Sequence, residues 1–462
     1  MSAGSFSHSP VTVAKVDTKY RKIVTQIPVP ESLPLIQQMY SQESRSMHGQ
    51  MPVIWDRADD FQIYDAWGNV WIDFTSTIFV ANAGHGNKRI IDALKAVIEK
   101  PLLHTYTYPS KERIDYLDYL IKNTPSQFEK AFLLSAGTEA TEAALKLMRM
   151  NGQKSGKKRG GVICFENAFH GRTMGAQMMT GSKKAKEWIG SQDPNIHHLP
   201  FPYPWLDEVK SNPKEFFHKS LNELLAKNKL NPKTDICGFM LETFQGWGAV
   251  FYPQEFIKEL TLFAREHEIL IAFDEMQAGF GRTGKLFGYM NYDVEPDLLC
   301  CGKGASSGLP LAIVLGSKEL LDLPDVGSMS STHSANPLCC VAGHANLEAM
   351  LDDGLIQNSN DLGEIFHNEL NNLKAEFPKH LKQVFGKGLL AALIFEDDDG
   401  NPLSHLCDVI SEKAFQKGLL VVHTGRESIK LAPPLSINEE ALLEGVSVLK
   451  QCILESLDNI KS

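Results

Sequence analysis

One lysine stands between two short apolar segments of the chain, in the sequence LLCCGKGASSGLPLAIVLG. The flanking segments, Leu298–Cys301 and Leu311–Leu315, are bounded by Pro and Gly, which is typical of buried strands inside a sheet. Lys303 would then lie at a sheet edge, where α/β enzymes place their active sites. Because a desolvated lysine amine is the usual nucleophile for a Schiff base, Lys303 is a candidate catalytic residue rather than a solvated surface lysine.

A carboxylate ends another apolar segment, in ILIAFDEMQAGFGRTGKLFG. Asp274 would lie at the tip of a buried strand, which is unfavourable unless the carboxylate has a cationic partner. The protonated pyridinium nitrogen of pyridoxal phosphate would be such a partner. Glu275, the next residue, is interpreted as a structural carboxylate that fixes the glycine-rich loop.

Two further segments could bind a ligand that carries a phosphate and an aromatic ring. In LLSAGTEATEAALKLMR, Gly137 and Thr138 begin a predicted helix, whose first N–H groups and positive dipole end suit a phosphate. An ordinary helix cap explains the same pattern. In FENAFHGRTMGA, Phe169 and His170 precede a glycine and could lay a flat face on a heterocycle, although a lone histidine is often only structural.

All these residues need a common scaffold. Five segments have the pattern of buried strands and are separated by stretches of helical pattern: Ala131–Ala136, Gly161–Glu166, Ile236–Glu242, Ile269–Glu275 and Leu298–Lys303. This alternation predicts a mostly parallel sheet with helices on both faces. After Leu323, a loop precedes a helical region, a strand-like GLLAALIFE and a final helix, NEEALLEGVSVLKQCI.

Taken in this order, the motifs resemble those of the class III (subgroup II) aminotransferases, and most closely the 4-aminobutyrate and ornithine types. The resemblance extends from IYDAWGNVWIDF to IKLAPPLSINEEAL, and its most specific element is FDEMQAGFGRTGKLFG. It implies an α/β fold of the aspartate-aminotransferase kind (fold type I), with a large domain built on a mostly parallel sheet flanked by helices and a small α+β domain. It also implies that Lys303 holds pyridoxal 5'-phosphate as a Schiff base.

The resemblance also implies a division of the chain into three parts. Residues 1–70 would form an N-terminal arm and a segment that packs with the small domain. Residues 71–330 would form the large domain that binds the cofactor, and residues 331–462 would form the small domain.

Within the cofactor site, the resemblance implies a role for each matching residue. Phe169 would stack on the cofactor ring, with His170 beside it, and Asp274 would pair with the ring nitrogen. Gly137 and Thr138 would bind the phosphate, and Gln277 would lie near the phenolic oxygen. Met276 would contact the second ring face, and Glu242 would support the reaction geometry. The family usually has a branched aliphatic residue at the position of Met276, and Glu242 could equally be a structural acid.

One implied contact crosses between two subunits. The segment SSTHSANP matches the threonine-bearing loop of the family, in which Thr332 would reach the phosphate bound by the other subunit. The resemblance therefore implies a homodimer with its sites at the interface.

The substrate side departs from the relatives. Trp247 replaces the glutamate that many relatives have after Gln-Gly, and Lys430 replaces the arginine that pairs with it, so this gate cannot be an ion pair. Lys430 could still bind a carboxylate as a point charge. Ile78 and Phe79 imply a narrower, more apolar pocket, and Arg172 is the expected anchor for a substrate carboxylate unless a nearby acid pairs with it.

We therefore expect an aminotransferase that uses an ω-amino acid or a related terminal amine, with 2-oxoglutarate or pyruvate as acceptor. A decarboxylase-transaminase or an amino-acid racemase of the same family would use the same lysine, aspartate and phosphate site. A non-catalytic cofactor-binding scaffold is a further alternative, against which the intact Lys303, Asp274 and Gln277 argue.

Composition agrees with an ordinary globular protein. The chain has 462 residues, of which 43% are hydrophobic and 22% charged, and its formal charge of −10 predicts no binding of nucleic acid or anionic membrane. The sequence has no apolar stretch of membrane-spanning length, and its start lacks a secretory signal pattern. We therefore expect a cytoplasmic protein whose first residues form an arm that is either flexible or draped over a partner. The eight cysteines lack CxxC spacing and are expected to be reduced core residues, with no metal site.

Overall fold

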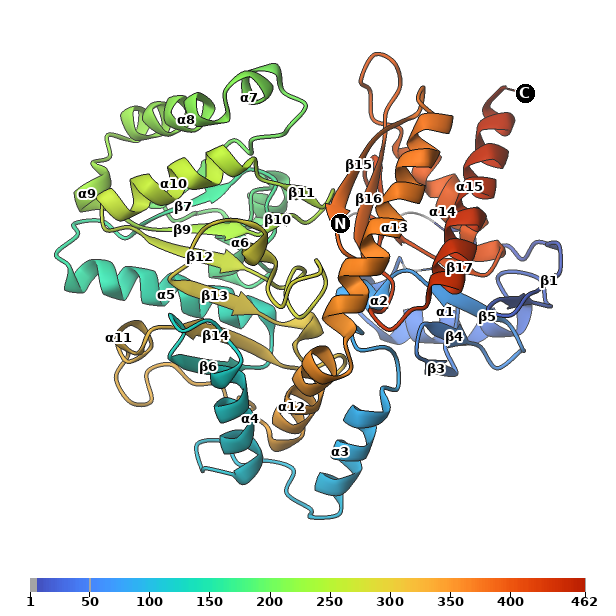
Figure 1. Ribbon diagram of the computed structural model, residues 1–462, viewed down its shortest axis with the longest axis horizontal. Coiled ribbons are helices and arrows are strands. Elements are labelled where there is room, and N and C mark those ends of the chain that lie inside the picture. The colour runs from blue at the N-terminus through green and yellow to red at the C-terminus, as the bar shows by residue number, and fades with distance from the viewer. Residues whose placement is uncertain (1–5, 50, 462) are drawn as a thin grey trace.

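Two lobes lie side by side in the computed structural model, which describes residues 6–49 and 51–461 (Figure 1). One lobe is built from the middle of the chain, and the other combines the two ends of the chain. The first five residues of the predicted N-terminal arm lie outside the described residues.

The central lobe contains a seven-stranded sheet in the order β6-β14-β13-β12-β9-β7-β8. Its strands are β6 (Lys130–Leu134), β7 (Gly161–Phe165), β8 (Ile196–Leu199), β9 (Ile236–Glu242), β12 (Leu270–Asp274), β13 (Leu298–Cys301) and β14 (Ala312–Gly316). Only β14 runs antiparallel to its neighbours, β13 and β6, among these pairings. The predicted mostly parallel sheet is confirmed, and each of the five predicted strands corresponds to one of these elements.

Helices cover both faces of this sheet, as predicted. On one face α5 (Gly137–Lys154) packs against β9, β13 and β14, and on the other α10 (Gln254–Glu266) packs against β12. Strand residues alternate between these faces: Ile271 and Phe273 belong to the core beneath α10, whereas Ala272 belongs to the core beneath α5. The small alanines of α5 let this helix approach the sheet closely, which brings its first turn to the strand ends.

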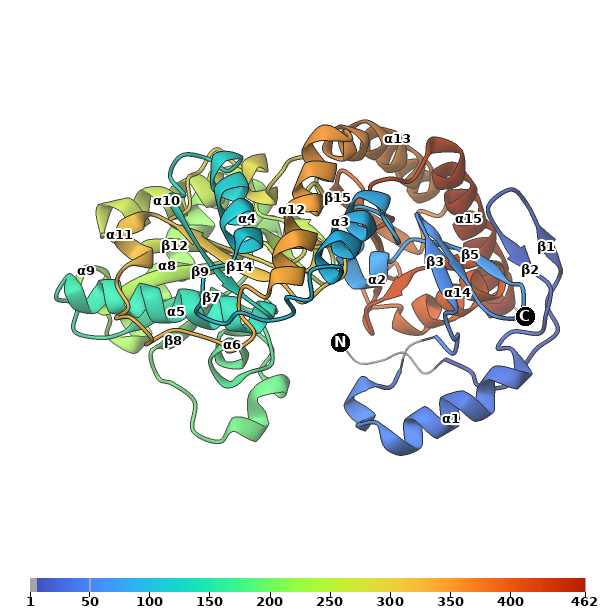
Figure 2. The same ribbon diagram turned by 90° about the horizontal axis from the view of Figure 1, so that it is seen from below.

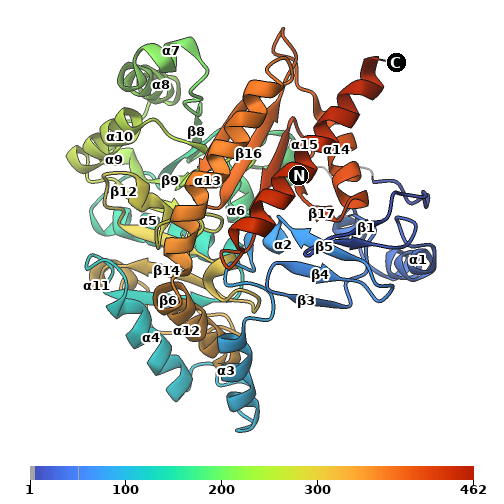
Figure 3. The same ribbon diagram turned by 45° about the vertical axis from the view of Figure 1, so that its right-hand side comes forward.

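The second lobe contains two sheets. An antiparallel sheet has the order β15-β16-β19-β18, formed by β15 (Leu381–Lys387), β16 (Leu390–Phe395), β18 (Val422–His423) and β19 (Ser428–Leu431). Over it, α13 (Leu355–Glu376) covers β15 and packs beside α15 (Glu439–Lys461), as Figure 3 shows. The strand predicted in GLLAALIFE and the final helix are both present as β16 and α15.

The other sheet joins the two ends of the chain. It has the order β1-β2-β5-β4-β3, and β17 pairs in parallel with β5. Its strands are β1 (Val16–Asp17), β2 (Lys22–Ile23), β3 (Arg57–Asp59), β4 (Gln62–Tyr64), β5 (Val70–Asp73) and β17 (Leu419–Leu420). The boundary proposed after residue 70 cuts β5, which begins at Val70. The three-part division remains a proposal.

Further helices complete the two lobes. Seen from below, α3 (Lys88–Ile98) and α12 (Pro337–Asp352) lie side by side between the lobes (Figure 2). The other elements are α1 (Leu33–Gln42), α2 (Ser76–Phe79), α4 (Lys111–Lys122), α6 (Met174–Met179), α7 (Asp207–Ser211), α8 (Pro213–Asn228), α9 (Pro232–Asp235), β10 (Phe244–Gln245), β11 (Val250–Phe251), α11 (Lys318–Leu321) and α14 (Ser404–Gln416). No helix among the described residues combines the length and the apolar character that crossing a membrane requires.

The cysteines contribute to the cores of both lobes. Cys339 is partly buried, and the other seven are buried, for example Cys164 and Cys300 beneath α5 and Cys407 and Cys452 in the second lobe. Their interpretation as small core residues agrees with these positions.

Candidate active site

A cavity of about 290 Å³ lies where the carboxyl ends of β9, β12 and β13 meet the first turn of α5. Ten of the candidate residues line it: Gly137, Thr138, Phe169, His170, Arg172, Glu242, Asp274, Met276, Gln277 and Lys303. Parallel strands bring these side chains together because their carboxyl ends lie at the same edge of the sheet.

Asp274 ends β12 and is only 5% exposed. Its Oδ2 lies 2.9 Å from His170 Nδ1, and its Oδ1 accepts a hydrogen bond from the Met276 backbone N–H at 3.1 Å. These two contacts fix the orientation of the carboxylate at the end of the strand. His170 therefore acts here as the partner of Asp274, a role that the sequence interpretation did not include.

Glu242 ends β9 directly beside Asp274, because the two residues are paired in the parallel register of β9 and β12. Its Oε2 accepts a hydrogen bond from the Phe169 backbone N–H at 3.2 Å. Burial raises the pKa of Glu242 to about 7, with His170 opposing this rise and Asp274 reinforcing it. Glu242 can thus hold or release a proton near neutral pH within the cavity.

Lys303 follows β13 and begins a short 3₁₀ turn, Lys303–Ala305, with a positive φ of 44°. Burial lowers the pKa of its amine, against the opposing charges of Asp274 and Glu242. A lowered pKa increases the fraction of neutral amine, which is the nucleophilic form. At Gly302, a Cβ atom would lie 2.5 Å from Met276 Sδ, so glycine lets Met276 pack tightly against the chain before the lysine.

The first turn of α5 forms a second part of the same cavity. Glu139 Oε2 accepts the backbone N–H groups of Ser135 and Ala136 at 2.9 and 3.0 Å, which fixes the chain as it enters the helix. Thr138 Oγ1 lies 2.5 Å from Thr173 Oγ1. Since Gly137 and Thr138 line the cavity, the positive end of the helix dipole faces it.

These groups fit pyridoxal phosphate. The start of α5 suits the phosphate, and the Asp274 carboxylate suits a protonated ring nitrogen. Phe169, which is 38% exposed, lines the cavity and offers an aromatic ring to the cofactor. Lys303 supplies the amine that the aldehyde requires.

Glu275 fixes the loop behind the site. Its carboxylate accepts the backbone N–H groups of Gly288 and Tyr289, both at 2.6 Å, and the Thr243 hydroxyl. Burial raises its pKa to about 7. These contacts agree with its interpretation as a structural carboxylate.

Lys430 lies deeper than the sequence suggested. It is 2% exposed, does not line the 290 Å³ cavity, and donates hydrogen bonds to Gln277 Oε1 at 2.6 Å and to the Gly246 carbonyl. Its amine lies 4.0 Å above the Phe79 ring. Burial lowers the pKa of Lys430 to about 7. Because a protonated lysine amine can only donate, this contact fixes which end of the Gln277 amide faces Lys430 when the amine is charged.

Trp247 has its own cationic partner. The Arg426 guanidinium lies 3.9 Å above the indole ring, and the indole N–H donates to Gln245 Oε1 at 2.9 Å. Gln245 also accepts the Tyr203 hydroxyl at 2.5 Å. Sequence reasoning missed Gln245, Tyr203 and Arg426, and no local motif indicates them, because they meet only in the folded chain.

Arg172 lies between two cavities. It lines the 290 Å³ cavity and also a neighbouring one of about 630 Å³, which Ile78 and Trp55 line as well. Its guanidinium is 5.6 Å from the Phe169 ring, and no carboxylate of the described residues lies within ion-pairing distance. The alternative in which a nearby acid neutralises Arg172 therefore has no support in the described part of the chain.

Two further candidate residues, Thr332 and Phe79, also lie outside the cofactor cavity. Thr332 is exposed, and its carbonyl accepts a hydrogen bond from His104 Nε2 at 2.7 Å. It does not line the cavity of its own chain. Phe79 is buried in a small apolar cluster with Trp247.

The turn that carries Ile78 and Phe79 has an unusual backbone. Ser76, Thr77, Ile78 and Phe79 have φ angles of 45°, 53°, 64° and 69°. Four consecutive left-handed residues without a glycine are costly, at roughly 1–2 kcal/mol for each residue. Sequence reasoning did not foresee this turn, because nothing in STIF favours a left-handed backbone.

Comparison with known proteins agrees with this site. The family model described as aminotransferase class-III matches residues 44–453. A 4-aminobutyrate aminotransferase from Mycobacterium leprae is 30% identical over 446 residues, which cover 94% of this chain and 98% of the relative. An alanine/serine racemase from Pyrococcus horikoshii is 29% identical over 464 residues, which cover 98% of this chain and 96% of the relative.

A solved structure supports the same conclusion. The (S)-enantioselective omega-transaminase from Thermomicrobium roseum has a TM-score of 0.83 and 26% identity, covering 91% of this chain and 98% of that structure. The predicted α/β fold of type I is confirmed, as are aminotransferase activity and dependence on pyridoxal phosphate. The chain belongs to the class-III aminotransferases.

Proposed function

We propose that this aminotransferase takes its amino group from an ω-amino acid or a related terminal amine and passes it to a keto acid such as 2-oxoglutarate or pyruvate. The observation that carries the proposal is the position of Arg172. Its guanidinium, without an acidic partner among the described residues, lines the cofactor cavity and the larger cavity beside it. It can therefore bind a carboxylate at the far end of a substrate whose amine reaches Lys303.

The proposed chemistry assigns one task to each residue of the cofactor cavity. Lys303 would hold pyridoxal phosphate in the resting enzyme, and the cofactor would supply the electron sink for the electrons left on the substrate carbon. The Lys303 amine, free while a substrate amine is bound in its place, would move the proton from the substrate carbon to the former aldehyde carbon of the cofactor. Asp274, held by His170 at 2.9 Å, keeps the ring nitrogen protonated. Glu242 supports this geometry through its contact with the Phe169 backbone.

The remaining contacts of the cofactor are part of the same proposal. Gly137 and Thr138 would bind the phosphate at the start of α5. Phe169 and Met276 would cover the two ring faces, and Gln277 would donate to the phenolic oxygen, because Lys430 occupies its carbonyl oxygen.

Substrate selection is proposed to involve the walls of the neighbouring cavity. Ile78 lines that cavity, while Phe79 and Trp247 pack together beside it. These apolar side chains favour a substrate with an apolar body. Lys430 is a second candidate for the carboxylate of the keto acid, but it would have to leave Gln277 and Gly246 to bind one.

A homodimer is proposed as the working form of the enzyme. Thr332 is exposed and lies outside the cavity of its own chain, which supports a role at the phosphate bound by a second subunit. We also retain the proposal that the protein is cytoplasmic.

Racemisation is the second candidate activity. The similarity to the alanine/serine racemase over 98% of this chain favours it. A racemase would return the proton to the opposite face of the same substrate carbon and would need no keto acid.

Half-reactions distinguish these activities. The purified holoenzyme is mixed with each member of a panel of amines, and the cofactor absorbance is recorded without keto acid. Loss of the absorbance of the aldehyde form with terminal amines, and its recovery on adding 2-oxoglutarate or pyruvate, are expected. Conversion of an amino acid into its mirror-image form without any keto acid would instead establish racemisation. A cofactor absorbance that changes with no amine would refute the proposal.

Two matched variants test the carboxylate assignment. Arg172→Met should raise the KM of donors that carry a distal carboxylate about tenfold or more, because a charged hydrogen bond is lost. Donors without that carboxylate should be affected much less. If Lys430→Met, and not Arg172→Met, raises the KM of the keto acid, the acceptor is bound by Lys430.

A further inference from the structure

The left-handed turn Ser76–Phe79 needs support from outside itself. Its backbone hydrogen bonds, from Phe79 N–H to Thr75 carbonyl at 3.0 Å and from Val80 N–H to Ser76 carbonyl at 2.7 Å, close one helical turn of the disfavoured hand. Isoleucine, with its branched Cβ, is a particularly unfavourable residue at positive φ. Such a backbone persists only where surrounding groups fix it.

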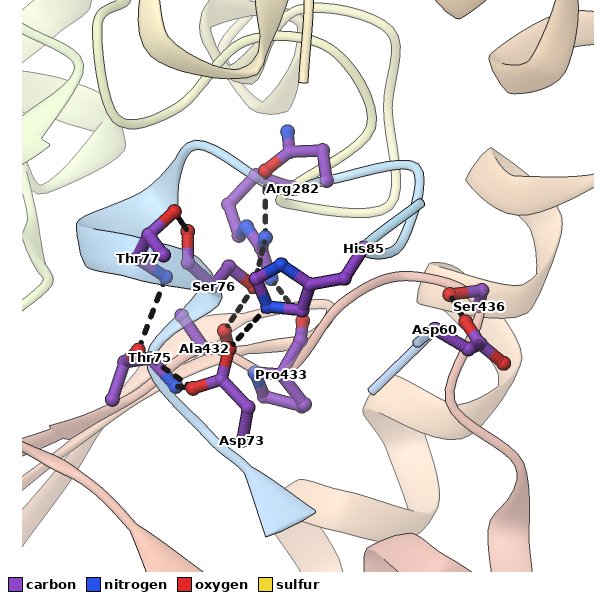
Figure 4. Close-up of polar contacts among 11 residues, drawn as sticks. Asp60, Asp73, Thr75, Ser76, Thr77, His85, Arg282, Ala432, Pro433 and Ser436 are labelled. Carbon is purple, nitrogen blue, oxygen red and sulfur yellow. Dashed lines mark hydrogen bonds and ion pairs between the residues drawn. The ribbon is translucent and has the colours of Figure 1, made fainter. Parts of the chain in front are cut away.

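One of those groups is a buried arginine. Arg282 is fully buried, and Figure 4 shows its guanidinium above Ser76 and Pro433. Nη2 donates to Ser76 Oγ at 3.1 Å and to Asn82 Oδ1 at 2.6 Å, which lie at the beginning of the turn and just after it. Nη1 donates to the carbonyls of Pro433 at 2.5 Å and Leu389 at 3.0 Å.

Arg282 thus joins four segments that surround the active site. It belongs to the glycine-rich loop that follows Asp274 and Gln277, and it reaches the turn, the segment after Lys430, and the loop before β16. Ser76 Oγ completes the connection by donating to the Ala432 carbonyl at 2.6 Å (Figure 4).

The electrostatics of Arg282 argue for a specific role. Its hydrogen-bond acceptors are neutral, and no carboxylate of the described residues lies within ion-pairing distance of it. Burial lowers its pKa to about 9, and Asp73 opposes this shift, so the side chain stays charged at neutral pH. A buried cation without an ion pair is unfavourable for folding. Its directed contacts with the turn offer a reason for its presence.

The start of the turn is fixed separately. Asp73 Oδ1 accepts the Thr75 N–H and hydroxyl at 2.7 and 2.6 Å, and Asp73 Oδ2 lies 2.8 Å from His85 Nε2 (Figure 4). Thr75 Oγ1 in turn accepts the Thr77 N–H at 3.0 Å. Arg282 therefore holds the first residue of the turn and the chain just after it, whereas Asp73 fixes the residues that lead into it.

We infer that Arg282 is a positioning residue for substrate binding: it holds the turn Ser76–Phe79 in its left-handed form, which places Ile78 in the wall of the substrate cavity and Phe79 against Trp247 and Lys430. This inference rests on the proposed function, because it takes the cavity that Ile78 and Arg172 share as the substrate site. It assigns no contact with cofactor or substrate to Arg282 itself.

The first experiment replaces Arg282 with lysine in the holoenzyme. Lysine keeps the charge but lacks the planar fork that reaches four acceptors. The KM of the amino donor should rise tenfold or more, while kcat and the cofactor content should change less than threefold. Amide hydrogen exchange of peptides covering residues 76–81 should accelerate at least tenfold. Arg265→Lys is the matched control, because Arg265 pairs with Asp297 outside the cavity.

A rescue experiment separates positioning from general support. Thr77 is exposed, and among the described residues its hydroxyl bonds only the Ser76 carbonyl. Because Thr77 also lines the cavity of Ile78 and Arg172, each Thr77 change is first measured alone, and its own effect on KM is subtracted. Glycine adopts a left-handed backbone without the steric cost that alanine retains. Thr77→Gly should therefore recover at least half of the KM loss in the Arg282→Lys background, whereas Thr77→Ala should recover none.

Three outcomes would overturn the inference. In the first, Arg282→Lys changes neither the KM of the amino donor nor the hydrogen exchange of residues 76–81. In the second, Arg282→Lys loses cofactor and stability but keeps its KM. In the third, Thr77→Gly and Thr77→Ala recover the KM equally. If Arg282→Lys does not fold, Ser76→Ala removes the hydroxyl contact and must show the same two effects. If the wild type reacts with no amine, the proposed function fails, and the exchange measurements still decide whether Arg282 holds the turn.

Discussion

The cofactor end and the substrate end of the site are built in different ways. At the cofactor end, Asp274, Glu242 and Lys303 each stand at or just after the end of a central strand, and the register of the sheet sets them beside one another. At the substrate end, the turn Ser76–Phe79 and Lys430 meet only through contacts between segments far apart in the chain. The first arrangement follows from local sequence, and the second depends on the whole fold.

The two ends also treat charge differently. Asp274 has an imidazole partner, and the cavity beside it suits a cationic ring. Lys430 and Arg282, in contrast, are buried cations whose hydrogen-bond acceptors are all neutral. We therefore expect substitutions at the cofactor end to alter the chemical step, and substitutions at the substrate end to alter affinity and stability.

The largest effect is expected from Lys303→Ala. This change should abolish turnover and the borohydride-dependent fixation of the cofactor to the chain, because the amine is both the attachment point and the proton carrier. Steady-state assays and mass spectrometry after borohydride treatment measure both effects, and circular dichroism should show an intact fold. Normal turnover by this variant would place the nucleophile elsewhere.

The next largest effect is expected from Asp274→Asn. A neutral amide cannot hold the ring nitrogen protonated, so kcat should fall about 100-fold or more while the cofactor stays bound. Single-turnover kinetics with a reactive amine measure the chemical step directly. Asp297→Asn is the matched control, since Asp297 pairs with Arg265 outside the cavity. Equal rates for the two variants would remove Asp274 from the electron-sink role.

Much of the fold and of the cofactor end could be predicted because the determining signals are local. Apolar runs ending in Asp274 or preceding Lys303 fix both the strand and the place of the functional residue at its end. The strand β8 was missed because its sequence, IHHL, contains two histidines and lacks the apolar pattern of a buried strand. The pairing of β17 with β5 joins segments that no sequence pattern connects.

The substrate end could be predicted only in part. Trp247 and Lys430 were identified as departures, but the partner of each, Arg426 and Gln277, is set by tertiary contacts. The left-handed turn was missed because STIF favours other backbone conformations, and its support comes from Arg282. The arginine itself stands in a recognised motif, GFGRTG, whose sequence alone gives it no specific task.

A smaller effect, on stability, is expected from Lys430→Met. Burial lowers the pKa of Lys430 from 10.5 to about 7. Between these pH values the unfolded chain binds more protons at this position than the folded chain, so folded wild type gains stability as pH rises, by up to about 1.4 kcal/mol per pH unit. The methionine variant lacks this gain. Its stability relative to wild type should be highest at pH 7 and below.

Urea unfolding of both proteins at pH 6.5, 8 and 9.5 tests this sign. The difference in unfolding free energy, variant minus wild type, should become steadily smaller as pH rises. A difference that is independent of pH would mean that Lys430 stays protonated throughout. In that case the substrate end would hold a permanent positive charge, and Lys430 would become the stronger candidate for binding a substrate carboxylate.

The smallest effect is expected at the contact between Gly137 and Met276, at the cofactor end. A Cβ atom at Gly137 would lie 2.8 Å from Met276 Sδ and 3.4 Å from its Cγ and Cε. Because a methionine side chain is flexible, Gly137→Ala should weaken cofactor binding by only about 1 kcal/mol.

Met276→Val shortens the side chain and should relieve this contact. Gly137→Ala should therefore cost less in the Met276→Val background, and cofactor dissociation constants of the four proteins give that coupling. Additive effects would show that the two residues act independently.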